Sequence, residues 1–147
     1  MDLKSFTYDP VGDVSAASNA SGTLSYTYDA NNRLTQSADG ASGQTLDYSY
    51  DAAGNRVGLK WEEKNQSASY SHDADNRLSS VTDPQGGVTS YLYDAAGREV
   101  SRTLPDGITT TDSYDGAGEL VGTRNSSGNS YSWGDSGNTL LLLPALQ

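Results

Sequence analysis

The sequence contains no cysteine, and it has only one phenylalanine, one methionine and one histidine in 147 residues. The absence of cysteine excludes disulfides and thiolate metal sites. Long apolar segments are missing as well, because the longest run, Leu140 to Leu143, is far too short to span a bilayer. Residues 1–8 lack the basic start and apolar stretch of a signal peptide. We therefore expect no membrane insertion.

Basic residues are scarce. Nine Lys and Arg stand against nineteen Asp and Glu, which gives a formal net charge of −10. A surface of that sign repels phosphate backbones, so we do not expect a nucleic-acid partner. The simplest interpretation of the charge is that it keeps the protein soluble.

Aliphatic side chains are few. Only 34% of the residues are hydrophobic, and many of these are alanine. Low aliphatic content together with abundant Gly, Ser, Asn and Asp is typical of disorder. Ten tyrosines argue against disorder, because aromatic residues are depleted in disordered chains and enriched in strands.

The tyrosines belong to a repeat. An aspartate that follows an aromatic residue recurs at steps of 20, 22, 22, 21 and 21 residues, and a variant copy ends at Trp133-Gly134. A period near 21 predicts a repeat architecture of about seven units followed by an apolar tail. The expected units are 1–14, 15–34, 35–57, 58–78, 79–100, 101–121 and 122–140, with the tail at 141–147. An array that starts at once and degenerates at its end favours a piece of a longer array over a short complete one.

Each copy opens with a strand pattern. Leu46, Tyr48 and Tyr50 are two residues apart, so in a strand they share one face. The same alternation occurs in most other copies, with Ser, Thr or Leu between the aromatic residues, and it predicts strands with one aromatic face.

A turn follows each strand. Three residues after each aspartate stands Gly or Asn, the residues that enter the left-handed region most easily. This spacing predicts a three-residue hairpin loop, a type I turn with a left-handed third residue, in which the aspartate accepts backbone hydrogen bonds. The expected turn residues are Asp9, Gly12, Asp29, Asn32, Asp51, Gly54, Asp73, Asn76, Asp94, Gly97, Asp115, Gly118 and Gly137.

The returning strand sets the register. In the second copy, a three-residue loop places Asp29 opposite Arg33 and Tyr28 opposite Leu34. In three copies the aliphatic residue comes one position later, at Val57, Val100 and Leu140, which calls for a longer loop or a different bulge. A second reversal closes each unit. The fold class is therefore all-β: an antiparallel meander of repeated hairpins with roughly fourteen strands, forming a curled sheet or a partial barrel or shell.

A single sheet of this width has no second layer to cover its aromatic face. Three arrangements solve this problem: the sheet closes on itself, it packs against another copy, or it is one patch of a larger shell. Exposed strands at the two ends favour self-association through the sheet edges.

Catalytic and metal-binding patterns are absent. His72 occupies a tyrosine position in a strand, and with Asp73 and Asp75 it lacks further ligands at a recognisable spacing. Glu62 and Glu63 are adjacent, so on a strand they point to opposite faces. Turn formation explains the repeated aspartates better than calcium binding does. We expect no enzyme, no cofactor and no metal.

The aromatic face has two interpretations. The favoured one is that it is the apolar surface that holds neighbouring hairpins together. The alternative is a carbohydrate-binding or cell-surface-binding module that stacks neutral sugars. The candidate platform is Tyr26, Tyr28, Tyr48, Tyr50, Tyr70, Tyr91, Tyr93, Tyr131 and Trp133.

The segments 28–34 (YDANNRL), 50–56 (YDAAGNR) and 93–98 (YDAAGR) resemble the YD repeat of Rhs proteins. This resemblance covers nearly the whole chain. It implies hairpins that spiral into a hollow β-shell, which in bacterial toxins encloses a toxic polypeptide and in animal teneurins serves adhesion. It also implies a non-catalytic structural role, a bacterial secreted or cell-surface location, and as partners the rest of a larger shell or an enclosed polypeptide. The chain has fewer repeats than such shells and no match to their self-cleaving core, so self-cleavage is not carried over.

Overall fold

The computed structural model describes residues 5–133 and 140–143, and every regular element in these residues is a β-strand. The chain divides into two compact units, Met1–Tyr70 and Ser71–Gln147. The strands of the first unit are β1 (Ser5–Tyr8), β2 (Val14–Asn19), β3 (Gly22–Tyr28), β4 (Leu34–Asp39), β5 (Gln44–Tyr50), β6 (Arg56–Trp61) and β7 (Gln66–His72), which ends two residues past the boundary. Those of the second are β8 (Leu78–Thr82), β9 (Val88–Tyr93), β10 (Glu99–Thr103), β11 (Thr109–Tyr114), β12 (Leu120–Asn125), β13 (Ser130–Trp133) and β14 (Leu140–Leu143).

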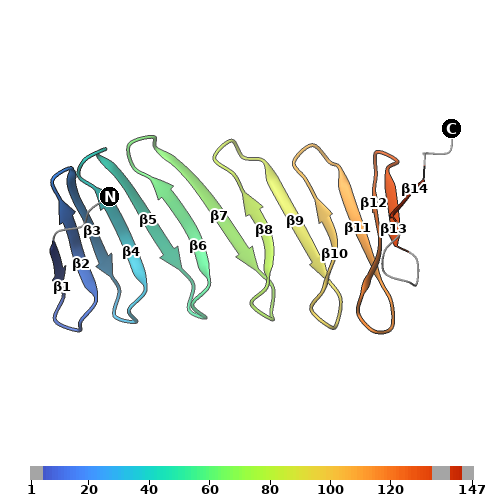
Figure 1. Ribbon diagram of the computed structural model, residues 1–147, viewed down its shortest axis with the longest axis horizontal. Helices are drawn as coiled ribbons and strands as arrows, with labels where there is room; N and C mark the ends of the chain where they lie inside the picture. The colour runs from blue at the N-terminus through green and yellow to red at the C-terminus, as the bar shows by residue number, and fades with distance from the viewer. Residues whose placement is uncertain (1–4, 134–139, 144–147) are drawn as a thin grey trace. The chain divides into compact units, whose positions relative to one another are not determined.

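Within each unit, every strand pairs antiparallel with the next strand in the sequence, so each unit is a meander of hairpins (Figure 1). The predicted all-β antiparallel meander is confirmed, including the expected number of strands. Within neither unit do the described strands close into a barrel, because the pairing runs from the first strand to the last without returning.

The hairpin register is nearly constant. Tyr28 pairs with Leu34, Tyr50 with Arg56 and Tyr114 with Leu120, and in each case a bulge follows directly after this pair. Val57 is the extra residue of its bulge, at the position that Thr35 holds in the second copy. The same bulge, and not a longer loop, therefore accommodates an aliphatic residue that comes one position late.

The expectation of a longer loop or a different bulge was therefore wrong for two of the three late copies. Val100 lies in the bulge after the Tyr93–Glu99 pair, as Val57 lies in its own. In the last copy Trp133 pairs with Leu140, one residue farther than elsewhere, so there the connection is longer.

No conventional core exists in the described part of the chain. Its only buried hydrophobic residues are the small Ala17, 5% exposed, and Ala68, 7% exposed. Side chains along β3 and β9 alternate between half-buried and exposed, which is the pattern of a single sheet with one apolar face. The cohesion of the chain must therefore come from contacts between neighbouring hairpins.

Candidate functional site

The Asp of each repeat organises its own turn. Asp29 Oδ1 accepts hydrogen bonds from the backbone N–H of Asn31 (2.8 Å) and Arg33 (3.0 Å), and Asn32 adopts φ 57°. The backbone N–H of Arg33, helped by its side chain, holds the pKa of Asp29 below its usual range. The turn thus depends on an ionised aspartate.

The other turns have the same form. The residue three after each aspartate has positive φ: Gly12 100°, Gly54 96°, Asn76 60°, Gly97 83° and Gly118 89°. Gly137 lies outside the described residues. The opposite ends of several hairpins use this loop too, for example at Gly86 and Gly107, where the sequence predicted a reversal.

The arginine that follows the turn joins two repeats. Arg33 Nε donates to Asp29 Oδ2 of its own turn at 2.7 Å. Its guanidinium carbon lies 4.7 Å from the ring centre of Tyr50 in the next repeat, and its Nη1 donates to the backbone carbonyl of Asp51 at 3.1 Å. One side chain therefore braces its own hairpin and stacks on the following one.

Two further arginines repeat this arrangement in the second unit. Arg77 pairs with Asp73 (2.8 Å), stacks on Tyr93 (4.8 Å) and donates to the Asp94 carbonyl (3.2 Å). Arg98 pairs with Asp94 (2.7 Å) and stacks on the ring of Tyr114 (4.5 Å). The contact is thus a property of the repeat and recurs wherever this position is arginine.

In four of the repeats, the tyrosine before the turn aspartate completes the link in the opposite direction. Its hydroxyl donates to a backbone carbonyl of the preceding repeat, at the residue where the returning strand begins. The bonds are Tyr28 to Val14 (2.9 Å), Tyr50 to Leu34 (2.9 Å), Tyr93 to Leu78 (2.9 Å) and Tyr114 to Glu99 (2.8 Å). Burial, with a contribution from nearby carboxylates, raises the pKa of the Tyr28 and Tyr93 phenols. We call these arginine and tyrosine contacts the repeat lattice.

The third and fourth copies depart from this pattern. Asn55 stands in the arginine position and donates to Asp51 Oδ2 at 3.0 Å, while Arg56 stacks on Tyr70 at 4.8 Å. His72 fills the position that tyrosine holds elsewhere, and its Nδ1 is buried without a hydrogen-bond partner in the described part of the chain. A neighbouring arginine has thus taken over the stacking contact.

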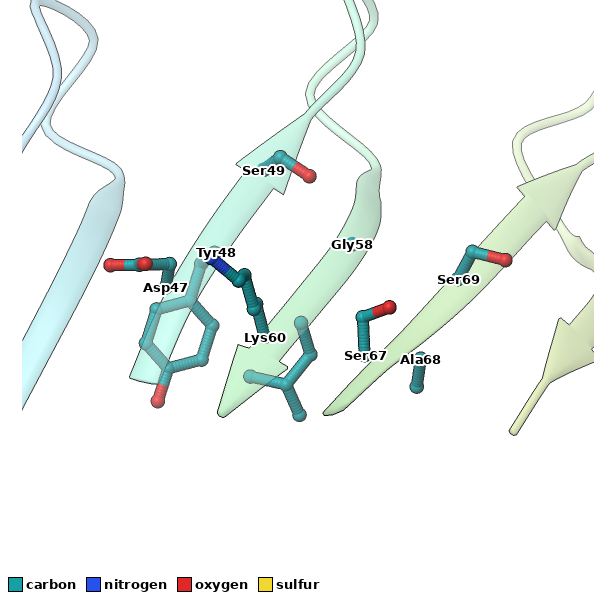
Figure 2. A pocket seen from close by; sticks show the side chains of 9 residues that line it. Asp47, Tyr48, Ser49, Gly58, Lys60, Ser67, Ala68 and Ser69 are labelled. Carbon is teal, nitrogen blue, oxygen red and sulfur yellow. The ribbon is translucent and has the colours of Figure 1, made fainter. Parts of the chain in front are cut away.

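The residues proposed for an aromatic platform are half-buried, apart from Trp133, whose side chain lies outside what the structure describes. Arginine covers the rings of Tyr50, Tyr70 and Tyr93. Tyr48 lines a pocket of about 360 Å³ with Leu59 and Ala68, formed by β5, β6 and β7 (Figure 2). Tyr48 thus borders a concave surface large enough for a small ligand, and Tyr26 borders a smaller pocket of about 160 Å³.

The described residues contain no group of three or more His, Asp or Glu side chains arranged to hold a metal ion. They also contain no helix that is long and apolar enough to cross a membrane.

Sequence reasoning missed the role of the arginines between repeats. It paired Arg33 only with Asp29 of its own hairpin. The available signal was that arginine recurs two residues or less after the turn Gly or Asn at positions 33, 56, 77 and 98, always with an aromatic residue one repeat later.

The RHS repeat family model matches residues 8–45, 72–110 and 93–130, which together make up about two thirds of the chain. The chain belongs to the RHS repeat family. No curated protein matches the sequence.

Solved structures share the fold. The crystal structure of TcdB2-TccC3 matches with a TM-score of 0.72 at 17% identity over 86% of this chain, and that of TcdB2-TccC3-Cdc42 with 0.71 at 16% identity over 95%. The pore structure of the Photorhabdus luminescens Tc holotoxin, carrying the mutation TccC3-D651A, matches with 0.58 at 15% identity over 90%. This RHS repeat chain spans a tenth or less of those chains: 8%, 8% and 10%.

Proposed function

We propose that this chain is a non-catalytic wall segment of an RHS-type β-shell, of the kind that encloses a polypeptide. The observation that carries the proposal is the repeat lattice. The aromatic and cationic side chains of one repeat, such as Arg33, contact the next repeat, Tyr50 and Asp51 in this case, and do not converge on a reactive centre. Contacts of this kind extend a wall one hairpin at a time.

The two faces of the sheet differ in a way that suits a wall. Tyr48, Leu59 and Ala68 are paired across β5, β6 and β7 and share one face, whereas the neighbouring row of Ser49, Gly58 and Ser69 belongs to the opposite face, because successive residues of a strand alternate between faces. In a shell the half-buried aromatic face contacts the enclosed chain, because extended polypeptide buries apolar surface against it. The proposed setting is a larger shell in a bacterial secreted or cell-surface protein.

Site-specific photo-cross-linking tests this role. A benzophenone side chain at Tyr48 reports on the aromatic face, and one at Ser49 is the matched control on the opposite face. In the protein as its host expresses it, we expect the label at position 48 to capture polypeptide and the label at 49 to capture much less. Equal capture from both positions, or none from 48, contradicts the wall role.

A second candidate function is recognition of neutral sugars, supported by the pocket beside Tyr48. The arginines that cover Tyr50, Tyr70 and Tyr93 argue against an extended stacking platform. A glycan array compares the native chain with Tyr48→Ala and Tyr91→Ala. The candidate fails if nothing binds, or if a bound glycan is indifferent to both substitutions.

A further inference from the structure

The N-terminal edge of the first unit carries an unusual group of exposed apolar side chains. Phe6 is 48% exposed, Tyr8 61% and Val11 72%, whereas the tyrosines at the position of Tyr8 in the next two repeats are half-buried. All four residues of β1 are exposed, and in the described part of the chain β1 pairs only with β2. An unpaired strand edge of this kind is a template for another strand.

Tyr8 lacks the partners that its counterparts have. Tyr28 and Tyr50 each donate a hydroxyl hydrogen bond to a carbonyl of the preceding repeat, and Arg33 stacks on Tyr50 from that repeat. For Tyr8, neither a hydroxyl bond nor a stacked cation occurs among the described residues. The interior repeats therefore specify what chemistry this tyrosine accepts: a guanidinium over its ring and a carbonyl at its hydroxyl.

The neighbouring backbone offers a third contact, a carbonyl that can accept a hydrogen bond. The Asp51 carbonyl accepts two hydrogen bonds, from Gly54 N–H of its own turn and from Arg33 of the preceding repeat. The Asp9 carbonyl accepts the equivalent bond from Gly12 N–H, and a carbonyl oxygen has two lone pairs. The side chain of Asp9 holds this turn in place, since its Oδ1 accepts hydrogen bonds from the backbone N–H of Val11, Gly12 and Asp13.

We propose that the β1 edge binds a β-hairpin of the same repeat type that carries arginine in the position of Arg33. This inference rests on the proposed wall function and names the partner on one side of the wall. The arginine stacks on Tyr8 and donates to the Asp9 carbonyl, the carbonyl after that arginine accepts the Tyr8 hydroxyl, and the returning strand pairs with β1. A second copy of this chain fits less well, because its last repeat has Asn138 where the arginine is required.

A peptide with the sequence of residues 22–39, which contains one complete turn and Arg33, is a suitable probe. Titrated into the full-length, isotope-labelled chain, it is expected to shift the amide resonances of β1 and the first turn. The Arg33→Gln peptide is expected to bind at least about fivefold more weakly, since it loses the stacking and the carbonyl bond. On a Tyr8→Ala chain the difference between the two peptides is expected to shrink, because the arginine no longer has a ring to cover and keeps only its bond to the Asp9 carbonyl.

Free hairpins are marginally stable, so the same peptide tethered through a Gly/Ser linker to the N-terminus provides a second measurement at high effective concentration. Hydrogen exchange in β1, at the residues whose N–H groups point away from β2, is expected to slow in the tethered chain and to speed up again when the tethered arginine is replaced by Gln. The proposal is overturned if neither format perturbs β1, if the shifts fall on other strands, or if the arginine makes no difference. The cross-linking result at Tyr48 does not depend on β1, so the two proposals fail separately.

Discussion

Replacing Arg77 tests the repeat lattice most directly. Its guanidinium stacks on Tyr93 at 4.8 Å, donates to the Asp94 carbonyl at 3.2 Å and pairs with Asp73 at 2.8 Å. A stacked cation at an exposed site contributes about 0.5–1 kcal/mol, and one hydrogen bond adds about 0.5–1.5 kcal/mol. The ion pair is partly exposed, so we assign it no additional stability.

Arg77→Gln is therefore expected to lower the free energy of unfolding by about 1–2 kcal/mol, or the melting temperature by roughly 2–8 °C in a chain of this size. Arg77→Lys is expected to fall between Gln and wild type, because an ammonium keeps the charge but not the planar stacking surface. Arg102→Lys is the matched control. Arg102 is exposed and its contact with Glu99 is long at 3.7 Å, so this change is expected to be nearly silent.

Urea and thermal unfolding, followed by the far-ultraviolet signal of the strands, provide the measurement. A double-mutant cycle of Arg77→Gln with Tyr93→Leu isolates the stacking contact and is expected to give a coupling energy of about 0.5–1 kcal/mol. If Arg77→Lys and Arg102→Lys behave alike, or if the coupling energy is zero, the arginine does not join the two repeats.

Three further predictions concern the turns and the tyrosine positions. Gly54→Val is expected to destabilise the fold by about 1–3 kcal/mol in urea unfolding, since it forces a β-branched residue to φ 96°, whereas Gly116→Ala, which meets no nearby atom, is expected to be silent. Stability is expected to decrease in acid. Four aspartates of the repeat turns have lowered pKa values in the folded state, so their contribution is complete above the ordinary aspartate pKa of about 3.9 and is lost as the pH falls through the folded-state values. These aspartates are Asp29, Asp51, Asp73 and Asp94. Melting curves between neutral pH and pH 2 check this, and a flat profile contradicts it. His72→Tyr is expected to raise the melting temperature, because it replaces an imidazole whose buried Nδ1 has no hydrogen-bond partner in the described part of the chain with the phenol that other repeats use. A lower melting temperature would mean that the site cannot hold the larger ring.

The strands and turns were predictable from the sequence, because the residues that determine each of them lie close together in the chain. Alternation at Leu46, Tyr48 and Tyr50 predicted a strand with one aromatic face, and this strand is β5. The turns were predictable because the loop is determined by one residue that tolerates positive φ, and Asn32 is such a residue. Each of these features depends on residues within one hairpin, so the local sequence is enough to predict it.

Features that depend on the stagger between neighbouring hairpins were not predictable. Whether Arg33 faces Tyr50 depends on how far one hairpin slides along the next, and the bulge after Leu34 contributes to that offset. The bulge itself leaves no composition signal, because its extra residue is Thr35 in one copy and Val57 in another. The aromatic platform for sugars and the turn residues as a functional set stay predictions.

The repeat lattice also explains how a sheet with almost no buried side chains can hold together. Stability in such an array is a sum of hairpin terms and neighbour terms, and here the neighbour terms come from identifiable side chains. Arg77 and Arg98 provide the stabilising contact between neighbouring hairpins at two successive junctions of the second unit. In the following repeat, Glu119 occupies the same position. A carboxylate cannot stack as a cation on an aromatic ring, and the adjacent Leu120 is exposed. Cohesion therefore varies along the array with the identity of one residue per repeat, and a change at that position acts on the junction between repeats without altering the hairpin that carries it.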